Sequence, residues 1–247
     1  MSNRFIHKLQ GFAALSEREI SALGQATSRP RSFGPRQHLI REGDSPGPVF
    51  VVLEGWAIRY KLLPAGTRQI MAFLMPGDAC DLHIGMLAEM DHSIETITGA
   101  SVATISPDAM VELMGNPGIA RAMYIAQLVD EGTLRAWIVS LGRRSSLERV
   151  AHLLLELYLR AIRVGLITGG EMELPLTQLV LADALGMTPV HMNRILQQLR
   201  TSGAIQLRRG LLTIPDPSPL VGLSGFDDNY LHRRLRFPPG MMEGQEP

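Results

Sequence analysis

The stretch 177–203 most constrains what this chain can fold into, because its residues specify two short helices joined by a tight turn. The first helix is expected to end before Gly186. Thr188 then offers a hydroxyl as N-cap, and Pro189 stands at the first helical position, where its missing N–H is tolerated. Gly203 supplies the left-handed residue that ends the second helix. This turn chemistry predicts a helical hairpin.

The second helix, expected over 189–202, has one apolar face and one polar face. The apolar stripe follows i, i+3, i+4, i+7 spacing and consists of Met192, Ile195, Leu196 and Leu199. The opposite row consists of Val190, Asn193, Arg194 and Gln197. Arginine suits guanine, asparagine and glutamine suit adenine, and an apolar group suits the thymine methyl. The row therefore predicts a helix that reads base edges in the major groove of DNA.

A basic run without acids surrounds this helix. No acidic residue occurs between Asp183 and Asp216, whereas several arginines do, and such a run suits a polyanion. Two apolar runs flank Arg208-Arg209-Gly210, which predicts a β-hairpin, or wing, with two arginines placed to reach DNA phosphates. The alternative is an ordinary helical hairpin and a capping hairpin with solvated arginines. The turn chemistry and the missing acids favour a DNA-binding helix-turn-helix.

The overall charge is balanced, so any affinity for DNA must come from local clusters of basic residues. The 247 residues hold 24 Lys and Arg against 24 Asp and Glu, so we expect clustered charge and a site doubled by dimerisation. The hydrophobic content of 45% is sufficient for real cores. No apolar run approaches the ~20 residues of a membrane span, and the N-terminus lacks the apolar core of a signal peptide. We expect a soluble cytoplasmic protein without membrane contact.

Between residues 36 and 105 the sequence changes to short β-prone runs. Gly-marked turns at 42–44, 54–55, 65–66 and 76–78 separate these runs. Many short strands with such turns predict a small antiparallel barrel or jelly roll, a fold that can enclose one small ligand. From residues 80 to 92 the strand pattern lapses, and a short helix with a loop is expected there. The predicted fold class is α+β.

A long helix is expected over about 119–141, with apolar residues on two sides. One side carries Ile125, Leu128 and Val129. The other carries the predicted dimer stripe, which consists of Leu134, Trp137, Ile138 and Leu141. A helix that is apolar on two sides is buried on two sides. A central helix of a monomer is one explanation, but a two-fold dimer is favoured because helix-turn-helix proteins read palindromes in pairs.

The predicted domain organisation follows from these elements. A sensor barrel is expected over 1–118, a dimerisation helix over 119–142 and a winged helix-turn-helix domain over 143–220. The remaining residues, 221–247, are rich in Pro and Gly and are expected to form a flexible tail.

This order of elements resembles the Crp–Fnr family of bacterial transcription regulators. The residues that carry the resemblance are REGD at 41–44, VFVVLEGWAIRY at 49–60, FLMPGDACDLH at 73–83 and ALGMTPVHMNRILQQLRTSGAI at 184–205. The resemblance covers nearly the whole chain except the tail. The segment GDACDLHIGMLAEMDHSI is most similar to an alphaproteobacterial subgroup.

The resemblance implies a ligand-sensing barrel that repositions the DNA-binding domains through the long helices. Where cyclic-nucleotide-binding members have Gly-Glu for the ribose and Arg-Ser/Thr for the phosphate, this chain has Asp81-Leu82 and His92-Ser93. With Cys80, these positions form the expected effector pocket. Replacing the phosphate-binding arginine by a largely neutral imidazole removes the main counter-charge for the phosphate. We therefore expect cyclic AMP to bind weakly or not at all.

The resemblance also implies DNA contacts. Family members commonly place Glu, which accepts from cytosine, at the position of Val190, whereas valine favours a thymine methyl. Arg194 keeps the family's arginine. By the same alignment, phosphate contacts are expected from Thr177, Thr188 and His191. The expected partners are palindromic double-stranded DNA, a second copy of the chain, RNA polymerase and an unknown small-molecule effector, if any.

Other chemistry receives little support from the sequence. A single cysteine excludes an intramolecular disulfide and an all-cysteine iron–sulfur cluster. Cys80 is a candidate redox sensor, but we favour a small buried hydrophobe. His83 and His92 are candidate metal or haem ligands, but no third ligand is evident. No enzyme motif is present, and we expect neither catalysis nor a cofactor or metal. The alternative function is a barrel-based binding protein or enzyme with a C-terminal oligomerisation module.

Overall fold

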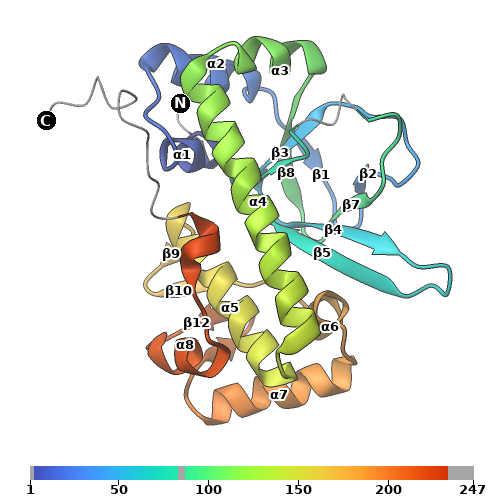
Figure 1. Ribbon diagram of the computed structural model, residues 1–247, viewed down its shortest axis with the longest axis vertical. Coiled ribbons are helices and arrows are strands. Elements are labelled where there is room, and N and C mark those ends of the chain that lie inside the picture. Colours follow the sequence, from blue (N-terminus) through green and yellow to red (C-terminus); the bar gives the residue numbers. More distant parts are fainter. Residues whose placement is uncertain (1–2, 83–86, 233–247) are drawn as a thin grey trace, which may run out of the picture.

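A computed structural model describes residues 3–82 and 87–232 of the chain. Figure 1 shows a sensor of β-strands on one side of a long diagonal helix, α4, and a smaller helical domain below it. The helix α4, Pro117–Arg143, starts beside the N-terminal helices and ends beside the helix α7, Pro189–Thr201, at the opposite end of the molecule. The predicted order of antiparallel β-strands, long helix and helix-turn-helix is confirmed; the name sensor is kept here only as a label for the β-strand domain with its short helices, up to residue 116.

The sensor is a jelly-roll-like sandwich of two four-stranded antiparallel sheets rather than a closed barrel. One sheet has the order β1-β8-β3-β6, formed by Arg31–Phe33, Ala100–Ile105, Val49–Glu54 and Ala79–Cys80. The other has the order β2-β7-β4-β5, formed by His38–Ile40, Ser93–Thr96, Ala57–Leu62 and Arg68–Leu74. The predicted helix and loop between residues 80 and 92 lie partly outside the described residues.

Short helices cover the sensor at one end, and a polar side chain caps the start of each. The helices α1, α2 and α3 span Arg4–Gln10, Glu17–Ala26 and Pro107–Met114. Ser16 and Glu19 form a reciprocal capping box at the start of α2. Ser106 caps α3 ahead of the proline at its first turn.

The DNA-binding candidate follows α4 through a sharp junction at Arg144 and Ser145. The helix α5, Ser146–Arg163, begins with a capping box between Ser145 and Glu148. The helix-turn-helix consists of α6, Gln178–Leu185, and α7, Pro189–Thr201. A third four-stranded sheet, β11-β12-β10-β9, is formed by Gln206–Arg208, Leu211–Thr213, Glu171–Glu173 and Ile167–Thr168.

The C-terminal prediction is wrong for part of the segment that it covers. The sequence assigns residues 221–232 to a flexible tail. In the structure the helix α8, Ser218–Ser224, extends into this segment, and a 3-10 helix, η2, spans Asp228–Leu231. Leu220 and Leu231 are buried, so these turns are held by tertiary packing that Pro- and Gly-rich composition does not reveal. The rest of the predicted tail, 233–247, lies outside the described residues.

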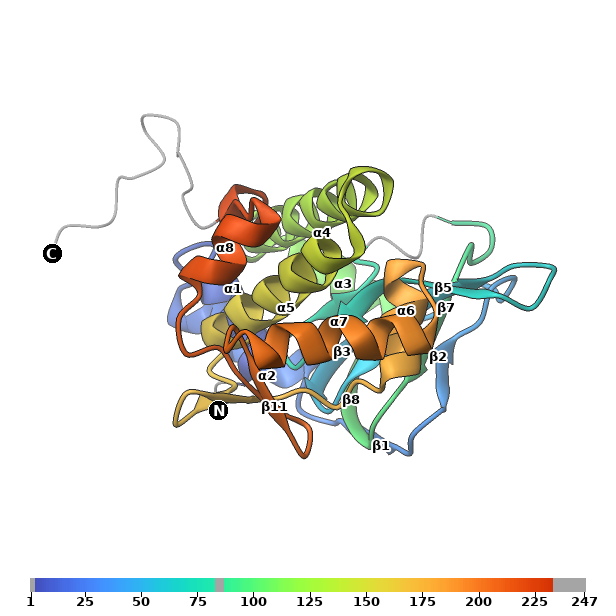
Figure 2. The same cartoon turned by 90° about the horizontal axis from the view of Figure 1, so that it is seen from below.

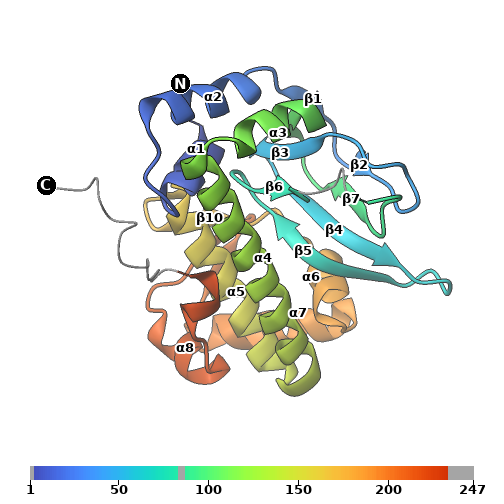
Figure 3. The same ribbon diagram turned by 45° about the horizontal axis from the view of Figure 1, so that its top comes forward.

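The helix-turn-helix domain is docked on the outer face of the sensor. A single hydrophobic cluster includes Ile58, Ile70 and Phe73 of the sensor together with α5, α6 and α7. At its edge the Arg68 side chain binds Asp183 of α6, with Nη2 2.8 Å from Oδ2. Figure 3 shows α6 lying below β4 and β5. The two domains therefore share apolar packing as well as a covalent linker.

Two turn glycines of the sensor give a matched stability test. Gly55 and Gly66 both have left-handed φ, +78° and +82°. A Cβ on Gly55 would lie 2.2 Å from the Gly99 carbonyl oxygen, whereas one on Gly66 would meet nothing within 4 Å. We expect Gly55→Ala to lower the free energy of unfolding by roughly 3 kcal/mol and Gly66→Ala by about 1 kcal/mol. Urea unfolding measures both, and equal losses would contradict the close approach.

Candidate nucleic-acid interface

The helix α7 presents its polar row to solvent. Thr188 Oγ1 accepts from the His191 amide at 3.2 Å, and Pro189 occupies the first turn, as the sequence predicts. The four apolar residues of the opposite stripe are buried: Met192, Ile195, Leu196 and Leu199. The predicted base-reading residues are exposed: Val190, Asn193, Arg194 and Gln197. Figure 2 views the molecule from this end, with α7 lying across it.

The turn between α6 and α7 sets how the two helices cross. Gly186 takes φ +62° as the C-cap of α6, and the Met187 amide donates to the Ala182 carbonyl at 3.2 Å. Ala182 is 1% exposed, so its small side chain lies within the helix crossing. Thr177 caps α6 by accepting from the Val180 amide at 3.2 Å. The hydroxyl oxygens of Thr177 and Thr188 therefore each accept a hydrogen bond from a backbone amide at the N-terminus of their helix.

A shallow groove runs between the start of α6 and the polar row of α7. It is lined by Gln178, Pro189, Val190, Asn193, Arg194 and Gln197. Gln178 is a residue that the sequence analysis missed. Its position directly after the N-cap Thr177 signals that it lies at the same end of α6 as the expected phosphate contact.

The predicted wing forms beside the helix-turn-helix. In the β11–β12 hairpin, Arg208 pairs with Leu211, and the turn residues Arg209 and Gly210 take φ of +52° and +80°. The side chains of Arg208 and Arg209 are exposed. The β9–β10 hairpin, which the sequence analysis did not predict, extends the sheet on the other side of β12. The two arginines therefore project from a four-stranded platform.

The acid that borders the basic run in the sequence is paired with a cation of the sensor. Asp183, on α6, accepts from Arg68 Nε at 2.9 Å and Nη2 at 2.8 Å. The Gln69 side-chain amide also donates to the Ala184 carbonyl at 3.1 Å. The sensor strand β5 thus neutralises the negative charge that borders the basic run. This contact strengthens the positive character of the interface.

The exposed face of α4 carries an apolar stripe that differs from the predicted one. Ile138 is 70% exposed and Leu134 39%, while Leu141 is half-buried. Trp137 is wrongly placed in the predicted dimer stripe, because it is buried in its own chain, where its Nε1 donates to Glu156 Oε2 at 3.0 Å. Helical spacing groups Trp137 with Ile138, but the packing of α5 separates them. Tyr124 extends the exposed face instead.

Residues of the predicted effector pocket bind one another and their neighbours. Asp81 accepts from Arg59 Nη2 at 2.9 Å and lies 3.0 Å from His92 Nε2. Ser93 Oγ accepts from the Glu42 amide at 3.0 Å. Cys80 is fully buried in the sensor core rather than at a pocket mouth, and burial raises the pKa of its thiol. The favoured interpretation of Cys80 as a buried hydrophobe agrees with this position.

Charge pairing dominates the electrostatics of this pocket. Burial by itself would raise the pKa of Asp81. Hydrogen bonding with His92 and the charge of Arg59 outweigh burial and lower this pKa. Burial likewise opposes the charged form of His92, but its bonds to Asp81 and Asp91 raise the pKa of the imidazole. Arg59 was not identified from the sequence, although a charged residue within the apolar strand run AIRYKL is a detectable signal. It brings a cation into the pocket.

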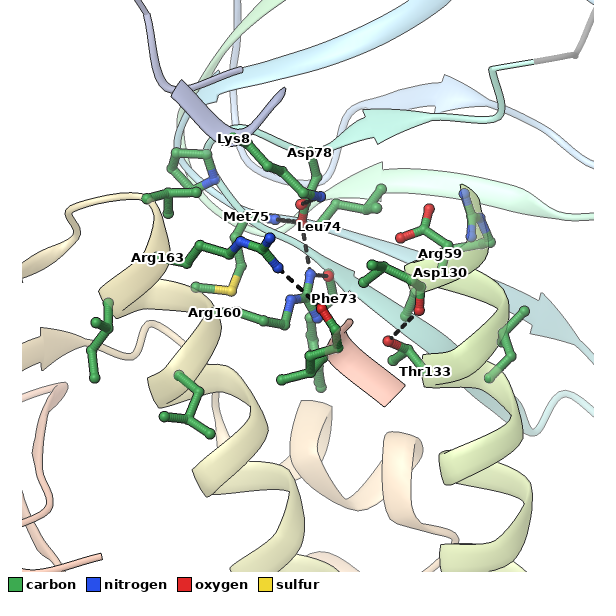
Figure 4. A pocket seen from close by; sticks show the side chains of 18 of the residues that line it. Lys8, Arg59, Phe73, Leu74, Met75, Asp78, Asp130, Thr133, Arg160 and Arg163 are labelled. Carbon is green, nitrogen blue, oxygen red and sulfur yellow. Dashed lines mark hydrogen bonds and ion pairs between the residues drawn. The ribbon is translucent and has the colours of Figure 1, made fainter. Parts of the chain in front are cut away.

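A cavity of about 250 Å³ lies where α1, β5, α4 and α5 meet. Figure 4 shows Lys8, Asp78 and Arg160 along its wall. Lys8 Nζ lies 2.6 Å from Asp78 Oδ1, and Arg160 Nη2 lies 2.7 Å from Asp78 Oδ2. Burial alone would raise the pKa of Asp78, but these two cations lower it. Asp130 also faces the cavity, and burial raises the pKa of its carboxyl.

Within residues 3–82 and 87–232, no group of three or more His, Cys, Asp or Glu side chains is placed to hold a metal ion. His83, one of the two histidines considered as ligands, lies outside these residues. In the same described part of the chain, no helix has the length and apolar character needed to cross a bilayer.

Two family models match the chain. The cyclic nucleotide-binding domain matches residues 30–116, and the Crp-like helix-turn-helix domain matches residues 148–223. The first corresponds to the sensor strands with α3, and the second extends from α5 to α8. The two matches leave the long helix α4 between them, in the order that the fold shows.

Relatives share this arrangement over most of their length. The nitrogen fixation regulation protein FixK of Azorhizobium caulinodans is 27% identical over 85% of this chain and 86% of its own. An anaerobic regulatory protein of Haemophilus influenzae is 25% identical over 85% of this chain and 82% of its own. The structure of FixK2 from Bradyrhizobium japonicum aligns with a TM-score of 0.71 and 27% identity over 79% of this chain and 96% of its own. Matching domains, relatives and architecture together show that the chain belongs to the Crp–Fnr family of transcription regulators.

Proposed function

We propose that this chain is a homodimeric, sequence-specific DNA-binding transcription regulator whose helix α7 reads bases in the major groove. The observation that carries the proposal is the exposed polar row of α7 within a run free of acids. Arg194 contacts guanine, Asn193 and Gln197 contact adenine, and Val190 contacts a thymine methyl. Such regulators bind DNA without a catalytic step, and the proposal includes none.

Phosphate contacts position α7 in the groove. The proposed contacts come from Thr177, Thr188 and His191 at the helix N-termini and from Arg208 and Arg209 of the wing. Helix N-termini attract anions because their amides and macrodipole point at the ligand. Exposed wing arginines add charge without reading sequence. The family further suggests RNA polymerase as a partner and the cytoplasm as the place of action.

The first prediction concerns base reading by Arg194. We expect Arg194→Ala to weaken specific DNA binding by about 1–3 kcal/mol, roughly five- to 150-fold, and to relax selectivity at one position of each half-site. Gel-shift titration against sites selected from random duplexes measures both effects. We expect the selected site to be a palindrome with half-sites about one helical turn apart.

Arg18→Ala is the matched control, because Arg18 is an exposed arginine on α2 at the other end of the molecule. It makes the same change in net charge and is expected to leave the affinity unchanged. Equal weakening by both variants, or selection of a site without two-fold symmetry, would argue against base reading by α7.

The second prediction concerns the dimer. Ile138, 70% exposed on α4, is proposed to pack with Leu134 and Leu141 against the same helix of a second copy. We expect Ile138→Glu to shift the protein toward monomers in analytical ultracentrifugation, because a charge placed in an apolar interface is unpaired there. Val111→Glu is the control, since Val111 is 73% exposed on α3, away from α4's free face. An Ile138→Glu variant that stays dimeric would remove α4 as the interface.

The third prediction concerns cyclic AMP. The sensor retains a cation, Arg59, but this side chain is already ion-paired with Asp81. The phosphate of cyclic AMP would have to compete with that carboxylate. We therefore expect a dissociation constant above about 1 mM, which corresponds to a binding free energy weaker than about 4 kcal/mol. Isothermal titration of the intact protein measures it. Micromolar binding would show that the pocket opens and that Arg59 exchanges Asp81 for the nucleotide.

A further inference from the structure

The chain continues beyond its helix-turn-helix domain and turns back toward the sensor. The matched domain ends at residue 223, and α8 ends at Gly225, which takes φ +59°. Residues 226–231, which include η2, then run beside α4 and α5 (Figure 1). We call residues 226–231 the C-terminal clamp. Its contacts reach three separate parts of the molecule.

The first contact is with α5 of the DNA-binding domain. The His152 ring contacts both Phe226 and Tyr230, at centroid distances of 4.8 Å and 5.8 Å, and it stacks on Tyr230 with an interplanar angle of 14°. Phe226 and Tyr230 meet edge to face at 6.0 Å. Just before the clamp, Arg144 Nε donates to the Ser224 carbonyl at 3.0 Å. Aromatic groups in these geometries attract one another beyond simple burial.

The second contact joins the clamp to both long helices through one carboxylate. The Tyr230 hydroxyl donates to Glu156 Oε2 at 3.0 Å, and Trp137 Nε1 donates to the same oxygen at 3.0 Å. Glu156 belongs to α5 and is fully buried, and Trp137 belongs to α4. A buried carboxylate needs its hydrogen-bond donors, because losing one leaves a costly unsatisfied group. Tyr230 therefore helps to fix the position of α5 on α4.

The third contact is a close approach of the clamp backbone to α4. Gly132 is buried on α4, and a Cβ at this position would lie 2.7 Å from the Tyr230 carbonyl oxygen. The backbone of the clamp therefore occupies the space that any other residue's side chain would fill. Glycine in the middle of a helix is unfavourable by roughly 0.5–1 kcal/mol relative to alanine. The close approach gives a physical reason for glycine at this position.

The fourth contact ties the clamp to the sensor. Leu231 is 3% exposed and belongs to the hydrophobic cluster that α1, α3, α4 and the sensor strands share. Its carbonyl accepts from Arg163 Nη1 at 3.1 Å, while Arg163 Nη2 donates to the Gly11 carbonyl at 3.2 Å. The same guanidinium lies 4.1 Å from the centroid of Phe12. Both ends of the clamp thus contact α5, and the Leu231 end also reaches the core that the sensor shares with α1 and α4.

We propose that the C-terminal clamp locks the DNA-binding domain, α4 and the sensor into one rigid body in the protein free of DNA. Domains joined by a linker move relative to each other unless their interface is large and apolar. The apolar packing of α5, α6 and α7 on the sensor already limits this motion, and the clamp adds a second constraint. The clamp opposes this motion because rotation of α5 on α4 would separate Tyr230 from Glu156 and withdraw Leu231 from the sensor core. The orientation of α7 is then held by the chain's own C-terminal residues as well as by the docked apolar face. The proposal does not depend on the DNA-binding function.

The test measures the distance between the two domains in solution. Spin labels are attached to cysteines introduced at Ser45, exposed on the sensor, and Thr201, exposed at the end of α7. The native Cys80 is fully buried and its thiol pKa is raised, so labelling is selective. Doubly labelled chains are mixed with excess unlabelled chains, so that a dimer that carries label carries only one labelled chain. Pulsed dipolar spectroscopy then gives the distribution of distances.

Two truncations separate the clamp from the residues that follow it. A chain that ends at His232 keeps the clamp and is expected to retain the narrow distance distribution of the full chain. A chain that ends at Gly225 lacks the clamp and is expected to show a broader distribution with new distances. If the shorter chain folds, as judged by circular dichroism, and its distribution stays narrow, the clamp does not hold the domains together.

A pair of glycine substitutions on α4 tests the clamp without removing it. Gly132→Ala is expected to displace the Tyr230 backbone and broaden the distribution. Gly142→Ala is the matched control, because a Cβ there meets nothing within 4 Å. The control is expected to leave the distribution unchanged. Identical narrow distributions for the two folded variants would overturn the proposal, even if the Gly225 truncation does not fold.

Discussion

The buried ion cluster around Asp78 joins the parts of the molecule on which the rest of the structure depends. One carboxylate oxygen binds Lys8 of α1, and the other binds Arg160 of α5, while the Met75 amide donates to the same carboxylate at 2.7 Å. Arg160 also donates to the Phe73 carbonyl at 2.8 Å. Breaking a buried pair by removing one partner typically costs about 3–5 kcal/mol, because the remaining charge is uncompensated. The cluster therefore fixes where the N-terminal helix and the DNA-binding domain meet the sensor.

Around this cluster, apolar packing and polar contacts act on different scales. The hydrophobic cluster between the sensor and the helix-turn-helix stabilises their association by burying apolar surface, an effect that does not depend on the direction of individual contacts. Directional contacts then select one arrangement: Arg68 with Asp183 at one edge, and Tyr230 with Glu156 at the other. Because these contacts lie on opposite sides of α5, the DNA-binding domain is constrained at two separated points. Two such points resist rotation better than either alone.

Local chemistry explains which elements the sequence predicts well. Thr188, Pro189 and Gly186 define the ends of α6 and α7 through capping, which depends only on neighbouring residues. Tertiary effects explain the differences. Trp137 shares helical spacing with Ile138 but is drawn inward by Glu156, a residue on another helix. Residues 221–232 look like a tail because their packing partners, such as Gly132 and His152, are distant in the chain. A motif search does not pair Arg59 with Asp81, because Arg59 lies on β4 whereas Asp81 directly follows β6.

The pairing of Asp183 with Arg68 has an electrostatic consequence for the surface that faces DNA. Both side chains are about a quarter exposed, so the pair is accessible to water and responds to salt. If the helix-turn-helix moved off the sensor, Asp183 would lose its counter-ion and bring a free negative charge next to an otherwise cationic surface. Repulsion from the phosphate backbone would then rise as the domain separates. Docking and attraction to a polyanion are thus linked through one carboxylate, with no ligand required.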